Sequence, residues 1–173
     1  LMFRNEVSEF IYKRTYSRWI EKEGRREEWS ETIARFINFL KLEKGELIPD
    51  KTYHKIEKYL LEFAVMPSMR FLWAAGDAAR KDHTVIYNCS FSKITSVKCF
   101  AECLHILMCG TGFGFSVKQE DVDQLPSIPD GIKSGQGRPK IIIEDTREGW
   151  ADSVKTLMES LYNGGNIYFD YSQ

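Results

Sequence analysis

The sequence has no excess charge of either sign and no long apolar run. Lys plus Arg number 24 and Asp plus Glu number 25, which gives a net charge of −1, so nothing favours non-specific binding to nucleic-acid phosphates. The longest stretch without a charged residue, Cys103 to Val117, is shorter than the ~20 residues of a membrane-spanning helix. The charged N-terminus does not have the pattern of a signal peptide. These absences predict a cytoplasmic protein that binds neither nucleic acid nor membrane.

Cysteine is scarce and is not arranged for metal binding. The four cysteines stand at positions 89, 99, 103 and 109 and form no CxxC pair. Structural zinc sites usually contain such a pair, and disulfide scaffolds are denser in cysteine. None of the three histidines stands in an HExxH pattern. The sequence therefore predicts reduced thiols and no metal site.

The chain has what a folded domain needs. It contains 173 residues, of which 43% are hydrophobic and 13% aromatic, so it can bury a core and is not expected to be disordered. Its length fits one domain, since single domains run to ~100–200 residues.

Residues 1–65 are predicted to be a helical region. Trp29, Ile33, Phe36, Ile37 and Leu40 recur at helical spacing, and Ser30 is the expected helix cap. A second helix is expected after Pro49-Asp50.

Residues 66–173 are predicted to be α/β. Strands are expected at 84–91, 112–117, 141–143 and 167–171, with a short extended piece at 71–75. Helices are expected at 100–108 and from Asp145, read as a cap with Glu148 three residues on. Alternating strands and helices indicate α/β layering.

Cys89 has two interpretations. Free cysteine is among the most buried residue types, so Cys89 is first expected to be a small core residue. Alternatively it is a redox thiol, which requires a second thiol within bonding distance. Cys99, Cys103 and Cys109 lie on or beside an apolar helix, and packing is favoured over metal binding for them.

Two glycine-rich segments are weak nucleotide signals. Residues 109–116, CGTGFGFS, follow a helix and enter a strand, whereas a dinucleotide fingerprint precedes its helix, so a tight turn is favoured. Residues 134–140, SGQGRPK, lack the GK[ST] of a phosphate loop and are expected to be a surface loop. The turn from Pro67 to Arg70 could meet an anion.

Taken together, several blocks resemble the adenosylcobalamin-dependent (class II) ribonucleotide reductases, specifically the ribonucleoside-triphosphate branch. The blocks occur in the order found in that family. They are YKRTYSRW (12–19), GRREEWSET (24–32), MPSMRFLWAAG (66–76), YNCSF (87–91), GTGFGFSV (110–117) and DTREGW (145–150).

The resemblance implies a fold and a chemistry. It implies that residues 66–173 form the first part of a ten-stranded α/β barrel, in which a thiyl radical takes the 3′ hydrogen of the ribose. Two further cysteines then reduce the ribose, and Cys89 matches the first of this redox pair. Ser68 and Ser90 would line the substrate side. The implied partners are a ribonucleotide, adenosylcobalamin and a thioredoxin-type reductant.

The resemblance also implies that this chain is incomplete for catalysis. The radical cysteine, its neighbouring glutamate and the second redox cysteine are expected in a remaining C-terminal part of the reductase. The chain would then be a split subunit, a truncated product or a segment ahead of an intein. A short stretch between 117 and 145 leaves a dimer open. The alternatives are a non-catalytic nucleotide-binding or assembly module derived from a reductase, or a plain helical interaction domain.

Overall fold

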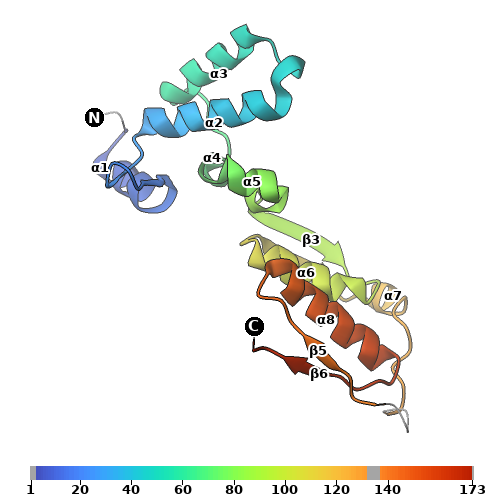
Figure 1. The fold of residues 1–173 in the computed structure, drawn as a ribbon. Coiled ribbons are helices and arrows are strands. Elements are labelled where there is room, and N and C mark those ends of the chain that lie inside the picture. The colour runs from blue at the N-terminus through green and yellow to red at the C-terminus, as the bar shows by residue number, and fades with distance from the viewer. Residues whose placement is uncertain (1–2, 132–136, 173) are drawn as a thin grey trace. The chain divides into compact units, whose positions relative to one another are not determined.

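Contacts within the chain divide it into two units. The computed structural model describes residues 3–131 and 137–172, and the division falls between Tyr87 and Asn88. We call residues up to 87 the helical unit and residues from 88 the α/β unit, and we describe each by itself (Figure 1).

The helical unit contains short and long helices and one small hairpin. Its elements are α1 (Glu6–Ile11), the π-helix η1 (Tyr12–Tyr16), β1 (Trp19–Ile20), β2 (Arg25–Arg26), α2 (Trp29–Lys44), the 3-10 helix η2 (Gly45–Leu47), α3 (Asp50–Leu61), α4 (Met69–Ala74), α5 (Asp77–Lys81) and the 3-10 helix η3 (His83–Ile86). The prediction of a helical N-terminal region is confirmed, with β1 and β2 added as an antiparallel pair.

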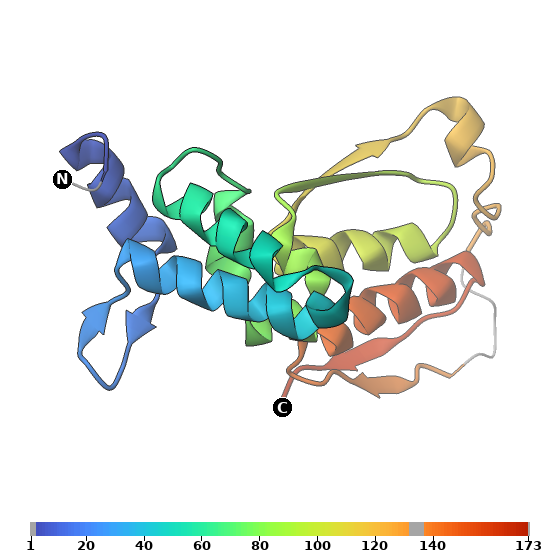
Figure 2. The same ribbon diagram turned by 90° about the horizontal axis from the view of Figure 1, so that it is seen from above.

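The core of the helical unit lies between α2 and α3, which run side by side in Figure 2. Ile33 and Ile37 of α2 are buried, as are Tyr53 and Leu60 of α3. Their helical spacing places them on one face of each helix, which is the amphipathic pattern that drives helix packing. Trp29 is also buried, and its indole Nε1 donates to the Leu60 carbonyl at 3.2 Å.

The predicted cap of α2 is wrong. Ser30 lies inside the helix, and Glu28 is the cap residue. The Glu31 carboxylate accepts a hydrogen bond from the Glu28 backbone N–H at 2.7 Å. A glutamate at the third position can therefore satisfy the end of a helix that lacks a small polar cap.

Residues 66–87, which the sequence analysis assigned to the α/β region, belong to the helical unit. The expected extended piece at 71–75 is wrong, because residues 69–74 form α4, which contacts α2 and η1. Leu72 and Ala74 are fully buried there. The sequence-based domain boundary at 65/66 stays a prediction.

The α/β unit consists of two strand–helix–strand segments. Its elements are β3 (Cys89–Lys93), α6 (Lys98–Met108), β4 (Gly112–Ser116), α7 (Gln119–Val122), β5 (Lys140–Ile142), α8 (Arg147–Tyr162) and β6 (Tyr168–Asp170). The strands expected at 112–117, 141–143 and 167–171 are present within a residue or two at each end.

Each strand–helix–strand segment forms a parallel pair. β3 pairs with β4 so that Cys89 lies opposite Gly112, and β5 pairs with β6 so that Lys140 lies opposite Tyr168. Parallel neighbours need a crossover connection, which α6 and α8 supply. The two helices also pack against each other.

Two predicted boundaries in this part of the chain need correction. The strand expected at 84–91 begins only at Cys89, because residues 83–86 form η3, where the Asp82 carboxylate accepts from the Thr84 N–H at 2.8 Å. The cap of α8 is Thr146 instead of Asp145, and its hydroxyl accepts from the Gly149 N–H at 2.9 Å.

The mixed α/β class is therefore observed, but the described residues form only two-stranded sheets. The ten-stranded barrel stays an implication of the resemblance. In the part of the chain that the structure describes, no helix combines the length and the apolar character that crossing a membrane requires.

Candidate functional site

Cys89 is an exposed thiol at the first residue of β3. The structure contradicts the interpretation of Cys89 as a buried core residue. Its strand neighbour is Gly112, and a side-chain carbon at Gly112 would lie 4.0 Å from the Cys89 Sγ. A partner can thus approach the thiol across a backbone that carries no side chain.

On the face of β3 and β4 that carries Cys89, the first two residues of β4 are glycines. Gly112 and Gly114 lie opposite Cys89 and Phe91 in the pairing, and the exposed Phe91 ring lies near Gly114, with Cδ2 3.4 Å from the position of a side-chain carbon there. Paired residues of neighbouring strands point to the same face of a sheet. The thiol therefore stands beside open backbone and one aromatic ring.

Ser90 lies on the opposite face of β3 from Cys89, since side chains alternate along a strand. It is half-buried, and its hydroxyl donates to the Gly112 carbonyl at 3.1 Å. This bond ties β3 to β4 beside the thiol. A role of Ser90 toward substrate stays a prediction.

The far end of the same two strands is held by a buried carboxylate. The Asp121 side chain is 2% exposed, accepts from the Ser116 hydroxyl at 2.8 Å and pairs with the Lys93 ammonium at 3.3 Å. The Ser116 hydrogen bond, together with Lys93, lowers the pKa of Asp121 despite its burial. Asp121 thus stays ionised and fixes the ends of β3 and β4.

Ser68 is the cap residue of α4 in the helical unit. It is exposed, and its hydroxyl oxygen accepts from the Phe71 N–H at 3.4 Å. A serine hydroxyl has one hydrogen to donate besides its acceptor lone pairs. Ser68 can therefore cap α4 and donate to a ligand at the same time.

The other end of α4 is held by two arginines that the sequence analysis did not select. Arg35 Nη1 donates to the carbonyls of Leu72 and Ala75 at 2.8 and 2.7 Å, and Arg18 Nε donates to the carbonyl of Trp73 at 2.8 Å. Arg18 stands in the YKRTYSRW block, so the block itself was a signal. Arg35 stands in none of the blocks.

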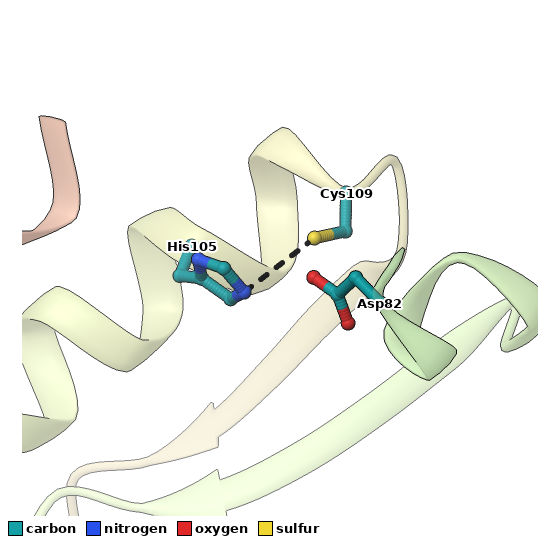
Figure 3. Close-up of side chains that lie close together, drawn as sticks. All are labelled: Asp82, His105 and Cys109. Carbon is teal, nitrogen blue, oxygen red and sulfur yellow. Dashed lines mark hydrogen bonds between the residues drawn. The ribbon is translucent and has the colours of Figure 1, made fainter. Parts of the chain in front are cut away.

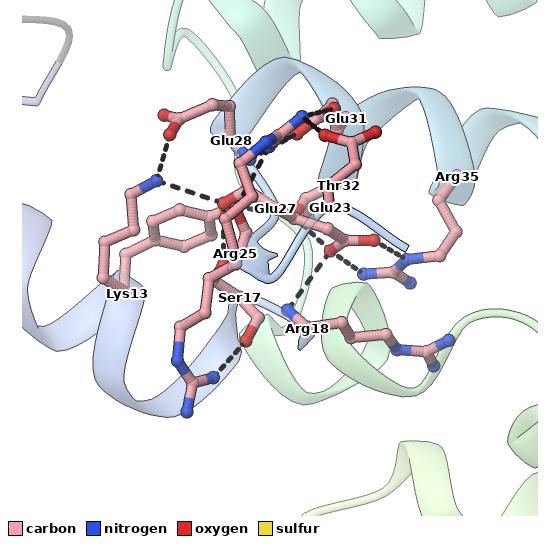
Figure 4. A network of polar contacts seen from close by, with 12 residues as sticks. Lys13, Ser17, Arg18, Glu23, Arg25, Glu27, Glu28, Glu31, Thr32 and Arg35 are labelled. Carbon is pink, nitrogen blue, oxygen red and sulfur yellow. Dashed lines mark hydrogen bonds and ion pairs between the residues drawn. The ribbon is translucent and has the colours of Figure 1, made fainter. Parts of the chain in front are cut away.

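A buried carboxylate orients Arg35, as Figure 4 shows. Glu27 is 6% exposed, and its two oxygens accept from Arg35 Nε and Nη2 at 2.7 and 2.9 Å. The Thr32 hydroxyl donates to the same carboxylate at 2.8 Å. Burial alone would raise the pKa of Glu27, but the Arg35 and Thr32 hydrogen bonds outweigh burial and lower it. The pair is a bidentate ion pair, the strongest geometry for these groups.

The other three cysteines behave mainly as packing residues. Cys99 and Cys109 are buried and Cys103 is half-buried. Burial raises the pKa of Cys103. Burial also opposes ionisation of Cys99, but hydrogen bonds from Ser96 outweigh it and lower its pKa.

Cys109 at the end of α6 has polar neighbours. Its Sγ lies 3.7 Å from His105 Nε2, one turn earlier on the helix, as Figure 3 shows. Arg147 Nη1 donates to the same sulfur at 3.1 Å. Arg147 is the first residue of α8 and Cys109 directly follows α6, so this contact joins the end of α6 to the start of α8.

The glycine-rich segment 109–116 is a helix-to-strand turn, as predicted. Gly110 has φ +78°, the left-handed region that favours glycine, and β4 begins at Gly112. Of the second segment, 134–140, residues 134–136 lie outside the described residues.

A groove of the helical unit holds none of the predicted site residues. It encloses about 590 Å³ and is lined mainly by apolar side chains, among them Phe3, Trp29, Phe63 and Met66. The sequence blocks 12–19, 24–32 and 66–76 supply part of its lining, among them Tyr12, Trp29 and Met66, but the sequence analysis did not predict a groove there.

Comparison with known proteins identifies relatives of one kind. The family model described as the ribonucleotide reductase alpha domain matches residues 2–77. The adenosylcobalamin-dependent ribonucleoside-triphosphate reductase of Lactobacillus leichmannii is 27% identical over 194 residues, covering 91% of this chain and 25% of that enzyme. The enzyme of the same name from Lactobacillus gasseri is 25% identical, covering 93% of this chain and 30% of its own length.

The fold has a close match among solved structures. A crystal structure of a B12-dependent (class II) ribonucleotide reductase superposes with a TM-score of 0.80 at 22% identity, covering 94% of this chain and 32% of that chain. This match concerns the fold. The chain spans about a quarter of the length of the curated relatives it matches.

Proposed function

We propose that this chain, a distant homologue of the N-terminal region of class II, adenosylcobalamin-dependent ribonucleotide reductases, supplies that region to an enzyme reducing ribonucleoside triphosphates. The observation that carries the proposal is the free, exposed thiol of Cys89 at the start of a parallel strand pair. The YNCSF block around it is the one the resemblance links to the redox pair.

Cys89 would be one of two thiols that reduce the substrate. When the 2′ hydroxyl leaves as water, the ribose needs two electrons. Two thiols provide them by forming a disulfide and releasing two protons, and a thioredoxin-type dithiol then restores both thiols by exchange. An exposed sulfur supports this role because exchange requires access to the attacked sulfur. The second thiol would come from the remaining part of the enzyme.

Ser68 would contact the ribonucleotide through its hydroxyl hydrogen. Its exposed position supports this role, as does its hydroxyl hydrogen, for which no acceptor is found among the described residues. Ser90 would act on the backbone beside Cys89 through its bond to Gly112.

Adenosylcobalamin is in the names of the curated relatives, and it would supply the radical that starts the reaction. No observation on the described residues identifies a surface for it. The proposal therefore assigns no residue of this chain to the cofactor.

The test is reconstitution with the remaining C-terminal part of the reductase. Both parts are mixed with adenosylcobalamin, a ribonucleoside triphosphate and a thioredoxin-type reductant, and deoxyribonucleotide is measured. Cys89→Ser should reduce turnover to background, whereas the matched control Cys103→Ser should retain it, because the Cys103 thiol is half-buried on α6. Full turnover of Cys89→Ser with this reductant would remove Cys89 from the redox pair.

A non-catalytic nucleotide-binding or assembly module is the second candidate. It is favoured by the small fraction of the relatives' length that the chain spans. Equilibrium binding of a labelled ribonucleotide without turnover in the reconstituted mixture is the result that would support it.

A further inference from the structure

Helix α4 is too short to hold its own position. It has six residues, and isolated helices below ~12–15 residues are marginal in water. Its last carbonyls have no partner inside the helix. Its placement must therefore come from contacts with other elements.

Besides the packing of the buried Leu72 and Ala74, two guanidinium groups bind the C-terminal end of α4. Arg35 Nη1 bridges the Leu72 and Ala75 carbonyls, and Arg18 Nε holds the Trp73 carbonyl. Cations near the C-terminus of a helix also interact favourably with its dipole. The carbonyls of Leu72, Trp73 and Ala75, at the C-terminal end of α4, are thus bound by side chains from outside the helix.

The Arg35 side chain is itself fixed at its other edge. Glu27 accepts from Arg35 Nε and Nη2, and Thr32 holds Glu27. The Arg35 side chain is 18% exposed and that of Glu27 8%. A partly buried, bidentate pair of this kind restricts the guanidinium to one orientation.

Gly76, two residues after α4, brings the backbone close to the Arg18 guanidinium. Gly76 has φ +128°, and a side-chain carbon there would lie 3.3 Å from Arg18 Nη1. The backbone that follows α4 is therefore shaped around the same guanidinium that binds it.

We propose that Arg35 and Glu27 are positioning residues for the ribonucleotide, acting through α4 on the Ser68 hydroxyl at its opposite end. This inference rests on the proposed substrate contact of Ser68. Because α4 has only six residues and Ser68 caps its first turn, a displacement at its C-terminal carbonyls is passed to the Ser68 hydroxyl. Misplacing a binding group by about an ångström is sufficient to weaken substrate binding markedly.

The test uses the reconstituted enzyme and the variant Arg35→Lys. Lysine keeps the charge but loses the planar fork that reaches Glu27 and both carbonyls. The KM for the ribonucleoside triphosphate should rise about tenfold, equivalent to about 1.4 kcal/mol, while kcat changes less than twofold. The matched control is Arg25→Lys, since Arg25 also binds a carboxylate, Glu31, at 2.7 and 2.8 Å, but on the exposed hairpin. Its KM should not change.

A double-variant cycle separates positioning from a general loss of stability. If Arg35 acts through Ser68, the KM of Arg35→Lys/Ser68→Ala should equal that of Ser68→Ala alone. If the double variant instead raises KM by the product of the two single-variant increases, the inference is overturned. An unchanged KM for Arg35→Lys would also overturn it.

The KM of Ser68→Ala alone shows whether the proposed substrate contact of Ser68 has failed. If Ser68→Ala leaves KM unchanged, the substrate contact of Ser68 is wrong and the inference falls with it. If Arg35→Lys does not fold, the cycle is measured with Glu27→Gln, which keeps the shape of the carboxyl group. A KM equal to that of Ser68→Ala in the double variant then supports the inference, and a multiplied or unchanged KM overturns it.

Discussion

At the scale of single residues, Gly149 explains part of the DTREGW block. A side-chain carbon at this position would lie 2.5 Å from the Glu144 carbonyl oxygen and 2.9 Å from its Cβ. Backbone cannot yield as a flexible side chain can. The first turn of α8 therefore packs against residue 144 only when residue 149 is glycine.

We expect Gly149→Ala to destabilise the α/β unit by about 1–3 kcal/mol, the usual cost of overpacking. Urea unfolding followed by circular dichroism measures it. Gly131→Ala is the control, because no atom lies within 4 Å of a side-chain carbon there. Equal stability of the two variants would contradict the expectation.

The proposal that Cys89 is a redox thiol also belongs to this scale. The motif alone left a core cysteine and a redox thiol as alternatives, and exposure decides against the first. Local pattern could not do so, because whether a strand face is covered depends on segments distant in sequence.

At the scale of elements, the start of α8 shows how closely two caps can compete. Asp145 with Glu148 fits the capping-box spacing, and Thr146 is one residue later. The structure uses Thr146, since its hydroxyl meets the Gly149 N–H at the tight approach of Gly149 to residue 144.

We expect Thr146→Ala to cost about 1 kcal/mol of stability, the usual value of a lost cap. Asp145→Ala, one residue away, should change stability by less than about 0.5 kcal/mol. Thermal unfolding of the two variants compares them. The reverse order would restore Asp145 as the cap.

The pairing of β5 with β6 carries a pH-dependent contribution. Lys140 and Asp170 lie on these neighbouring strands, with Nζ and Oδ2 2.6 Å apart. The Lys140 hydrogen bond, with others from Ser172, lowers the pKa of Asp170 to about 2. A carboxyl whose pKa is lowered on folding stabilises the fold above its unfolded pKa of about 3.9, and that contribution is lost as the pH falls toward 2.

We therefore expect Asp170→Asn to unfold at a lower urea concentration than the parent chain at pH 7. The difference should shrink between pH 4 and pH 2, where the parent loses the same contribution. Asp152→Asn, on the exposed side of α8, is the control and should match the parent throughout. A difference that persists at pH 2 would show that the ion pair is not its source.

Helix α4 is one of the elements that sequence reasoning missed. Its six residues do not show a long helical period, and the extended interpretation of 71–75 was reasonable locally. The helix is stabilised by Arg18 and Arg35, which lie 55 and 37 residues from their acceptors. A window of local sequence contains neither.

At the scale of the whole molecule, the chain spans a fraction of the length of the enzymes to which it is similar. The alignment with the Lactobacillus leichmannii reductase includes 91% of this chain but only 25% of that enzyme. One exposed thiol cannot form an intramolecular disulfide without a partner. The proposed reduction of ribonucleotides is therefore expected to require a second thiol from a further part of the enzyme.

We expect the chain alone to form no deoxyribonucleotide from ribonucleoside triphosphate, adenosylcobalamin and a dithiol, and the reconstituted pair of parts to form it. Product analysis by chromatography distinguishes the two mixtures, and the C-terminal part alone is the control. Turnover by the isolated chain would contradict the proposal that it is incomplete.

The sequence by itself determined the helical N-terminal region, the strand–helix–strand order and the resemblance to class II ribonucleotide reductases, because hydrophobic periodicity and ordered blocks are local properties. Only the tertiary structure decided that Cys89 is exposed, that 69–74 is helical and that Glu27 and Arg35 hold its end. Each of these depends on groups far apart in sequence, whose meeting is set by packing and by the need to pair every buried charge and carbonyl.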